Sequence, residues 1–187
     1  SANELILAAA NAGITIGSSA LIANNGANAT AVTIVGTNIV TLSGPSTFTG
    51  NLNINGGTLL ANRGNNSLNP ATSALGNPQN GTRSIIVNNG GTLQFVTGDT
   101  LGGANSSILS TLVVNQGGLV TNTTGVFNTF GPLQMNGGTI NGAGGAVAGY
   151  QMYNLRGTVT VGGSSVSTLA GSGTFAGYHL AAPTVFN

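Results

Sequence analysis

The chain contains no cysteine and very little charge. Without Cys, neither a disulfide framework nor a Cys-based metal site can form. Charged residues make up only 3% of its 187 residues, against roughly a quarter in ordinary soluble domains. The formal net charge of +1 leaves no basic patch for nucleic acid and no acidic tail. Because so neutral a surface has little colloidal repulsion, we expect the protein to associate with itself.

The scarcity of acids and imidazoles excludes most catalytic chemistry. Glycoside hydrolysis needs two facing carboxylates, and the only two acids, Glu4 and Asp99, stand on a terminal segment and an insertion. His179 is the only histidine, so neither a metal-ligand set nor a Ser-His-Asp triad can be assembled around it. We interpret it as a tail or packing residue. The sequence therefore predicts no enzyme activity and no cofactor.

Long hydrophobic runs are also missing. The longest purely apolar run, Leu5 to Ala10, is far too short to span a bilayer, so we expect no transmembrane segment. The chain begins at Ser1 rather than Met. This is expected either of a protein whose leader has been removed or of an excerpt from a longer chain.

What the sequence does have is glycine, asparagine and short apolar/polar alternations. Residues 38–62 contain two such alternations, each closed by a glycine turn. In the second, Leu52 and Ile54 share one face while the intervening asparagines share the other, which indicates a half-buried strand. Asn55-Gly56-Gly57 then turns the chain, because Gly and Asn accept backbone angles that other residues resist.

This strand–turn unit returns along the chain at uneven intervals of roughly 20 to 30 residues. One such coil cannot bury its apolar face alone, but stacked coils form a continuous core. The sequence therefore predicts an all-β parallel β-helix (a solenoid) of about seven to nine coils. An antiparallel sandwich is the competing fold. The solenoid is favoured because the unit Asn-Gly-Gly-apolar keeps its internal order.

Equivalent turn residues of stacked coils lie above one another, so their side-chain amides are expected to form a ladder. The residues of this predicted asparagine ladder and its turns are Asn55, Gly56, Gly57, Asn88, Gly90, Gly91, Asn115, Gly117, Gly118, Asn136, Gly137 and Gly138.

Three regions follow from the pattern. Residues 1–13 combine helix formers with Asn3 as a cap and Gly13 past the end, which predicts a short capping helix; a leading strand and a segment docking into a neighbouring subunit are the alternatives. Residues 14–177 form the β-helix, with loop insertions at 62–84 and 97–110. Residues 178–187 form an extended tail or cap. Arg63 and Arg83 bracket the first insertion and are expected to be solvated, or to pair with a partner's carboxylate.

Residues 39 to 95 resemble the passenger-associated transport repeat, also called the autotransporter-associated β-strand repeat. The matching elements are Val40–Gly44, Pro45–Gly50 and Asn53–Leu59, continued by Ser73–Gly76 and Val87–Leu93. The resemblance implies a right-handed parallel β-helix on a secreted or surface-exposed bacterial protein. The chain is very short for that family and carries none of its C-terminal membrane-barrel sequence.

Three functions remain open. The favoured one is a structural extracellular protein, the subunit of a surface filament or matrix that assembles end to end with itself. The alternative is an adhesin-like passenger module that binds a host surface or a glycan through the loop insertions. A third, ice or crystal-surface binding, needs regular Thr-x-Thr ladders. Thr158–Val159–Thr160 is the candidate expected in a strand, whereas Thr47–Phe48–Thr49 is expected in a turn. The apolar residues predicted to make the assembly contacts are Leu5, Ile6, Leu7, Leu180, Val185 and Phe186.

Overall fold

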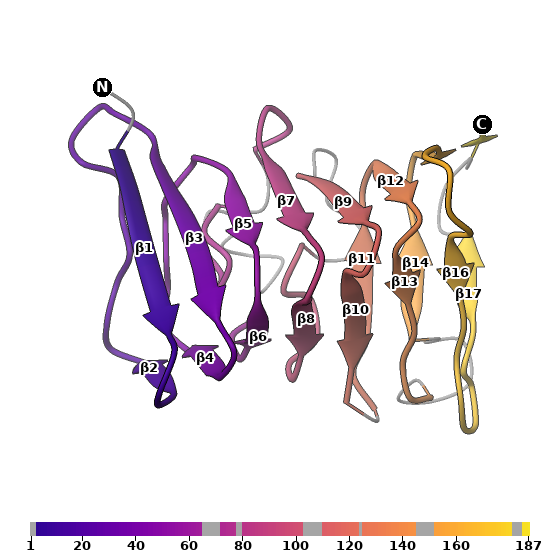
Figure 1. The fold of residues 1–187 in the computed structure, drawn as a ribbon, viewed down its shortest axis with the longest axis horizontal. Coiled ribbons are helices and arrows are strands. Elements are labelled where there is room, and N and C mark those ends of the chain that lie inside the picture. Colours follow the sequence, from indigo (N-terminus) through magenta and orange to yellow (C-terminus); the bar gives the residue numbers. More distant parts are fainter. Residues whose placement is uncertain are drawn as a thin grey trace.

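The predicted parallel solenoid is confirmed. The structure is a computed structural model that describes residues 3–64, 72–77, 80–102, 110–123, 125–144, 152–180 and 185–187. All of the regular elements in these ranges are β-strands, and every strand pairing within the three sheets is parallel, which excludes the antiparallel sandwich. The strands follow one another along the long axis, and the two chain termini lie at opposite ends of it (Figure 1).

Three sheets make up the sides of the solenoid. Sheet 1 has eight strands: β1 (Asn3–Ala9), β3 (Thr30–Gly36), β5 (Leu52–Ile54), β7 (Ser84–Val87), β9 (Thr111–Asn115), β12 (Leu133–Asn136), β15 (Thr158–Val161) and β18 (Val185–Phe186). Sheet 2 has seven: β2 (Ile14–Ile16), β4 (Ile39–Leu42), β6 (Gly57–Ala61), β8 (Gly91–Phe95), β10 (Leu119–Asn122), β13 (Thr139–Ile140) and β16 (Thr168–Leu169). Sheet 3 has three: β11 (Asn128–Phe130), β14 (Tyr153–Leu155) and β17 (Tyr178–Leu180).

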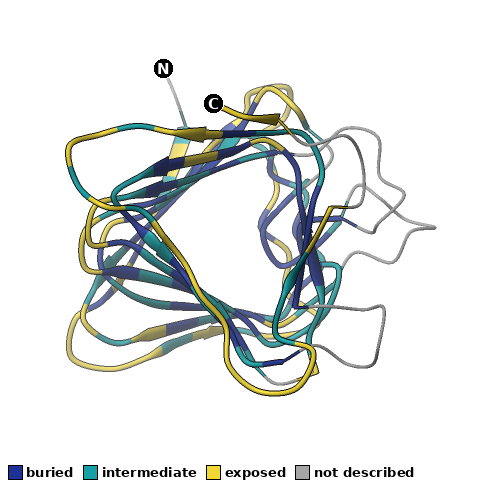
Figure 2. Cartoon of the chain, turned by 90° about the vertical axis from the view of Figure 1, so that its right-hand side faces the viewer, coloured by how far each residue is buried: buried dark blue, intermediate teal, exposed yellow. Residues whose placement is uncertain are grey.

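Each coil passes through sheet 1 and then sheet 2 before it returns along the third side. The seven strands of sheet 2 each follow a strand of sheet 1, so the described residues make seven coils and the first strand of an eighth. This number agrees with the seven to nine expected from the repeat. Viewed along the axis the section is three-sided, with buried residues facing the interior (Figure 2). Both loop insertions, 62–84 and 97–110, belong to the third side, and residues 65–71, 78–79 and 103–109 of them lie outside the described ranges.

In-register pairing stacks apolar side chains into columns that run the length of the core. The clearest one passes through every strand of sheet 1, from β1 to β18. We call it the first core column; its members are Leu5, Val32, Leu52, Ile85, Leu112, Leu133, Val159 and Phe186. A parallel second core column comprises Leu7, Ile34, Ile54, Val87, Val114, Met135 and Val161. The middle members of both columns are buried, so each coil covers the apolar face of the next.

The predicted N-terminal capping helix is wrong, and the leading-strand alternative is right. Residues 3–9 form β1, which pairs along all seven residues with β3. Leu5, Leu7 and Ala9 point inward while Glu4 and Ile6 point outward. The sequence hid this alternation, because apolar residues stand on both faces of the strand. Seven residues of ladder pairing with β3 outweigh a helix propensity that differs by less than about 1 kcal/mol per residue.

From the fourth coil onward an aromatic stack fills the corner near sheet 3. Phe95, Phe130, Tyr153 and Tyr178 come from successive coils, with centroid separations of 6.1, 4.6 and 5.7 Å. The Tyr153 hydroxyl donates to the Asn141 carbonyl at 2.9 Å. Burial raises the pKa of Tyr153 and of Tyr178, so both phenols stay neutral donors at physiological pH.

The turn glycines are needed where one coil passes close to the next. A Cβ on Gly91 would lie 2.4 Å from the Ile54 carbonyl oxygen, which is backbone and cannot move aside. A Cβ on Gly17 would have no other heavy atom within 4 Å. Close packing of coils therefore restricts position 91 to glycine, whereas position 17 has room for a larger residue.

We expect Gly91→Ala to lower the free energy of unfolding by more than about 2 kcal/mol, because the added methyl group forces two coils apart. Gly17→Ala is the matched control and should stay within about 0.5 kcal/mol of the parent. Urea unfolding followed by circular dichroism measures both. Equal stability of the two variants would contradict the packing described here.

Candidate functional site

The four predicted ladder asparagines form one hydrogen-bonded row. The Asn88 side-chain amide donates to Asn55 Oδ1 at 2.6 Å. Asn115 donates to Asn88 Oδ1 at 2.6 Å, and Asn136 donates to Asn115 Oδ1 at 2.9 Å. Each asparagine stands where a strand of sheet 1 ends, so one coil-to-coil step separates each pair. Amide ladders of this kind link stacked coils in addition to the main-chain bonds.

A glycine with positive φ follows each ladder asparagine. These residues are Gly57, Gly90, Gly117 and Gly137, with φ between 65° and 85°. In this range an L side chain is strained, so the turn chemistry at all four corners depends on glycine. The ladder begins in the third coil and ends in the sixth, since Val35 and Gly162 occupy the corresponding positions on either side.

At the N-terminal end the core is open. Strand β1 pairs only with β3, and β2 pairs only with β4, so both strands leave one main-chain edge without a strand partner among the described residues. The inward residues Leu5, Ile14 and Ile16 are half-buried there, whereas their counterparts one coil further in are fully buried. The predicted assembly residues Leu5 and Leu7 therefore belong to the core columns, while Ile6 lies on the outer face and is exposed.

At the C-terminal end the apolar residues are more exposed. Strands β18, β16 and β17 end sheets 1, 2 and 3. Phe186 is 56% exposed although it continues the first core column, and Leu169 and Leu180 are exposed at the ends of sheets 2 and 3. The predicted residue Val185 is likewise exposed, on the other face of β18. Figure 2 shows this exposed terminal coil end-on.

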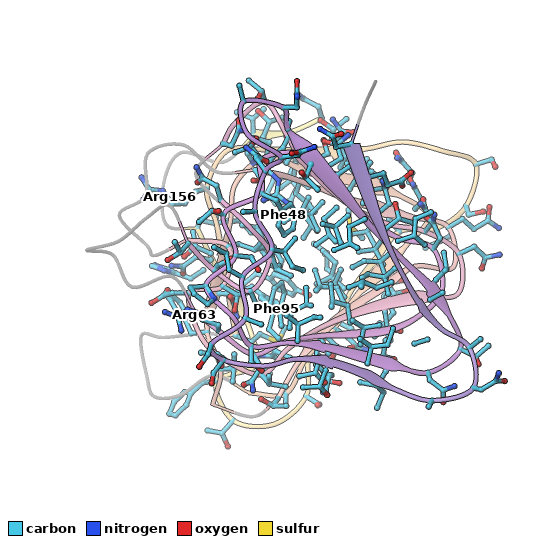
Figure 3. The ribbon with its side chains drawn as sticks, turned by 90° about the vertical axis from the view of Figure 1, so that its left-hand side faces the viewer. Phe48, Arg63, Phe95 and Arg156 are labelled. Atoms are coloured by element: carbon cyan, nitrogen blue, oxygen red, sulfur yellow. The ribbon has the colours of Figure 1, made fainter. Side chains whose placement is uncertain are left out.

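All three arginines lie on the third side of the solenoid. Figure 3 shows Arg63 and Arg156 on its outside, while Phe48 and Phe95 point into the core. Arg83 does not match the expectation of a solvated residue, because it is 2% exposed. Arg83 stands at an ordinary position before a strand, so nothing in the sequence indicated that its side chain is buried.

His179 is exposed and extends a short polar row on sheet 3. Its Nδ1 lies 2.9 Å from Asn154 Oδ1, and the Asn154 amide donates to Thr129 Oγ1 at 3.4 Å. The histidine is thus a hydrogen-bonding surface residue of β17. Among the described residues no group of three or more His, Cys, Asp or Glu side chains is arranged to hold a metal ion.

A threonine row that sequence reasoning missed crosses the outside of sheet 2. Register aligns Thr58, Thr92, Thr139 and Thr168, but Ile39 and Leu119 occupy the same row. Each strand supplies a single member, so no Thr-x-Thr motif marks the row in the sequence. Thr158 and Thr160 lie instead on β15 in sheet 1.

A groove of about 370 Å³ lies where sheet 2 meets the third side in the fifth to seventh coils. Asn122 occupies an inward position that is apolar in the preceding coils. Its Nδ2 donates to the Val126 carbonyl, and its buried Oδ1 has no hydrogen-bond partner among the described residues. The groove is lined by small and uncharged polar residues: Thr121, Asn122, Asn141, Gly142, Ala143, Ala170, Gly171 and Ser172.

The chain matches no protein-family model, no curated protein and no solved structure. The likeness to passenger-associated transport repeats therefore stays a prediction. No helix within the described ranges has the length and apolarity needed to cross a membrane.

We expect Asn88→Ala to lower the free energy of unfolding by about 1–2 kcal/mol, because it removes one ladder donor and one ladder acceptor. The matched control is Asn89→Ala, an exposed neighbour in the same turn and outside the ladder, which should change stability by less than about 0.5 kcal/mol. Chemical denaturation of both variants gives the comparison. If Asn88→Ala cost no more than its neighbour, the ladder would have no role in stability.

Proposed function

We propose that this chain is a structural extracellular protein, the subunit of a surface filament or matrix that assembles head to tail by stacking β-helix coils. The observation that carries the proposal is the exposure of core residues at both ends of the solenoid. Within the described residues, Leu5 begins the first core column and Phe186 ends it, and no further coil of these residues covers either side chain. A second copy placed along the axis would extend that column in the same order.

Strand direction supports the same arrangement. Because all of the sheets are parallel, moving a copy along the axis places β1 beside the free edge of β18 with unchanged polarity. Main-chain hydrogen bonds across such an edge give affinity without any specific side-chain pairing. A heterologous contact that does not close on itself produces a fibre rather than a ring.

Electrostatics does not oppose the contact. The chain carries a formal net charge of +1, and at the N-terminal end Glu4 points outward and accepts a hydrogen bond from Thr33 at 2.5 Å. The two ends therefore meet as largely apolar surfaces. Neutral, unblunted sheet edges are the condition under which proteins associate edge to edge. An extracellular setting at a bacterial surface is proposed from the repeat resemblance.

A second candidate function, an adhesin-like module, is favoured by the groove on the third side. Hydroxyl and amide groups such as those of Thr121, Asn141 and Ser172 suit the hydroxyls of a neutral glycan. Residues 65–71, 78–79 and 103–109 of the loop insertions predicted for this role lie outside the described residues. This function and assembly through the ends use different surfaces and can be tested separately.

Charge placed at either end tests assembly. Leu5→Lys and Phe186→Lys should each weaken self-association about 100-fold or more, since each would bury an unpaired ammonium against the next copy. At an open end the lysine reaches solvent, so the fold is retained. Sedimentation velocity over a range of concentrations measures the association. Ile39→Lys, which adds the same charge on the outer face of β4, is the control and should still assemble.

Mixing the two variants identifies the geometry of the contact. Each retains one intact end, so an equimolar mixture should form dimers and stop there. Dimers of Leu5→Lys alone would show that two C-terminal ends associate, which contradicts head-to-tail stacking. A wild-type chain that stays monomeric at millimolar concentration would refute assembly altogether.

The adhesin function predicts that wild-type protein binds features on a printed array of neutral glycans and that Thr121→Trp, which fills the groove, does not. Gln94→Trp adds the same ring one coil away on sheet 2 and should retain the binding. Binding that survives Thr121→Trp, or a wild-type chain that binds no glycan, would rule out this role for the groove.

A further inference from the structure

Arg83 is a buried cation on the third side, directly before β7. Its guanidinium stacks over the Phe48 ring, with Cζ 4.8 Å from the ring centroid. Its Nη1 donates to the Leu75 carbonyl at 2.7 Å and to the Asn77 carbonyl at 3.1 Å. These contacts hold the position and the plane of the group but neutralise none of its charge.

The packing around Arg83 is specific. Gly76 has φ of +86°, and a Cβ there would lie 2.9 Å from Arg83 Nη1 and 2.5 Å from the Phe48 carbonyl oxygen. The turn that carries Leu75 and Asn77 therefore packs against the Nη1 end of the guanidinium. With its plane held by Phe48 and Nη1 held by two carbonyls, the opposite edge of the group has a defined direction.

That opposite edge is unused. Nε and Nη2 are both buried, and neither has a hydrogen-bond partner in the part of the chain that the structure describes. These two nitrogens carry the parallel N–H groups with which arginine binds a carboxylate or phosphate in a bidentate manner. A buried donor left without an acceptor is costly, and a buried charge without a counter-charge is costlier.

Neither of the chain's two acids pairs with this edge. Glu4 accepts from Thr33 on sheet 1, and the buried Oδ1 of Asp99 has no hydrogen-bond partner among the described residues. Desolvation lowers the pKa of Arg83 to about 9, which still leaves the side chain charged at neutral pH. The charge is therefore present and uncompensated by the protein's own acids.

We propose that the Nε–Nη2 edge of Arg83 is a binding site for a small oxyanion that presents two oxygens, such as a carboxylate, sulfate or phosphate. The ligand completes the hydrogen bonding of the buried guanidinium and supplies the missing counter-charge. Because Arg83 is bracketed by the turn over Phe48 and by β7, the bound anion fastens the base of the first loop insertion to the coil. This site does not depend on assembly through the ends.

The chain's three arginines make the site directly observable. In protein labelled with ¹⁵N-arginine, three Nε–Hε signals are expected, and Arg63→Lys and Arg156→Lys each remove one, which leaves the third assigned to Arg83. Full-length protein dialysed into Bis-Tris chloride is titrated with sodium acetate, sulfate or phosphate at constant ionic strength. The Arg83 signal should shift saturably with at least one of these anions, by several times the shift of Arg63 or Arg156.

A second measurement detects an oxyanion that is already bound at Arg83 when the protein is purified. Ion chromatography of the denatured, dialysed protein should then find about one oxyanion per chain, and Arg83→Lys, which lacks the two-donor edge, should carry none. Wild-type protein that shows neither a saturable Arg83 shift nor a co-purifying oxyanion overturns the proposal. Shifts of equal size at all three arginines, or carriage of the anion by Arg83→Lys, overturn it as well.

Discussion

In-register parallel pairing between neighbouring coils is the constraint on which the rest of this structure depends. It sets one coil about 4.8 Å above the next and places each residue over its equivalent. From that single rule follow the apolar core columns, the asparagine ladder, the aromatic stack and the need for glycine where coils come close. Every coil buries its apolar face only against another coil, so the repeat itself contains no feature that ends the stack.

The same rule explains why charge is nearly absent. Stacking repeats each side chain above its equivalent, and a repeated charge would repel its own neighbours, whereas amides satisfy one another in either direction. Asn88 and Asn115 use both the donor and the acceptor of the amide in this way. Arg83 departs from the pattern: it is a single buried cation in one coil, with no equivalent above or below it and no acid to pair with. A site that breaks the repeat in this way is where a function other than stacking is expected.

Much of this fold can be predicted from sequence, because strand alternation and Asn-Gly-Gly turns are local signals. The ladder asparagines and their positive-φ glycines stand at the ends of recognisable strands, so their register could be inferred. Residues 3–9 could not be assigned in the same way, since apolar residues on both faces of β1 conceal the alternation and only pairing with β3 decides it. Burial of Arg83 and the threonine row of sheet 2 depend on contacts between residues far apart in the chain, which no local pattern records.

Each end of the described solenoid exposes core residues as a cut through its middle would, and the proposal requires a second copy to cover them. Electron microscopy of the wild-type chain at neutral pH tests this most directly. We expect thin unbranched filaments with an axial repeat of roughly 34–38 Å per subunit, the height of seven to eight stacked coils at about 4.8 Å each. If grids prepared at concentrations well above those used for other assembling proteins showed only short, separate rods, the proposed assembly would be contradicted.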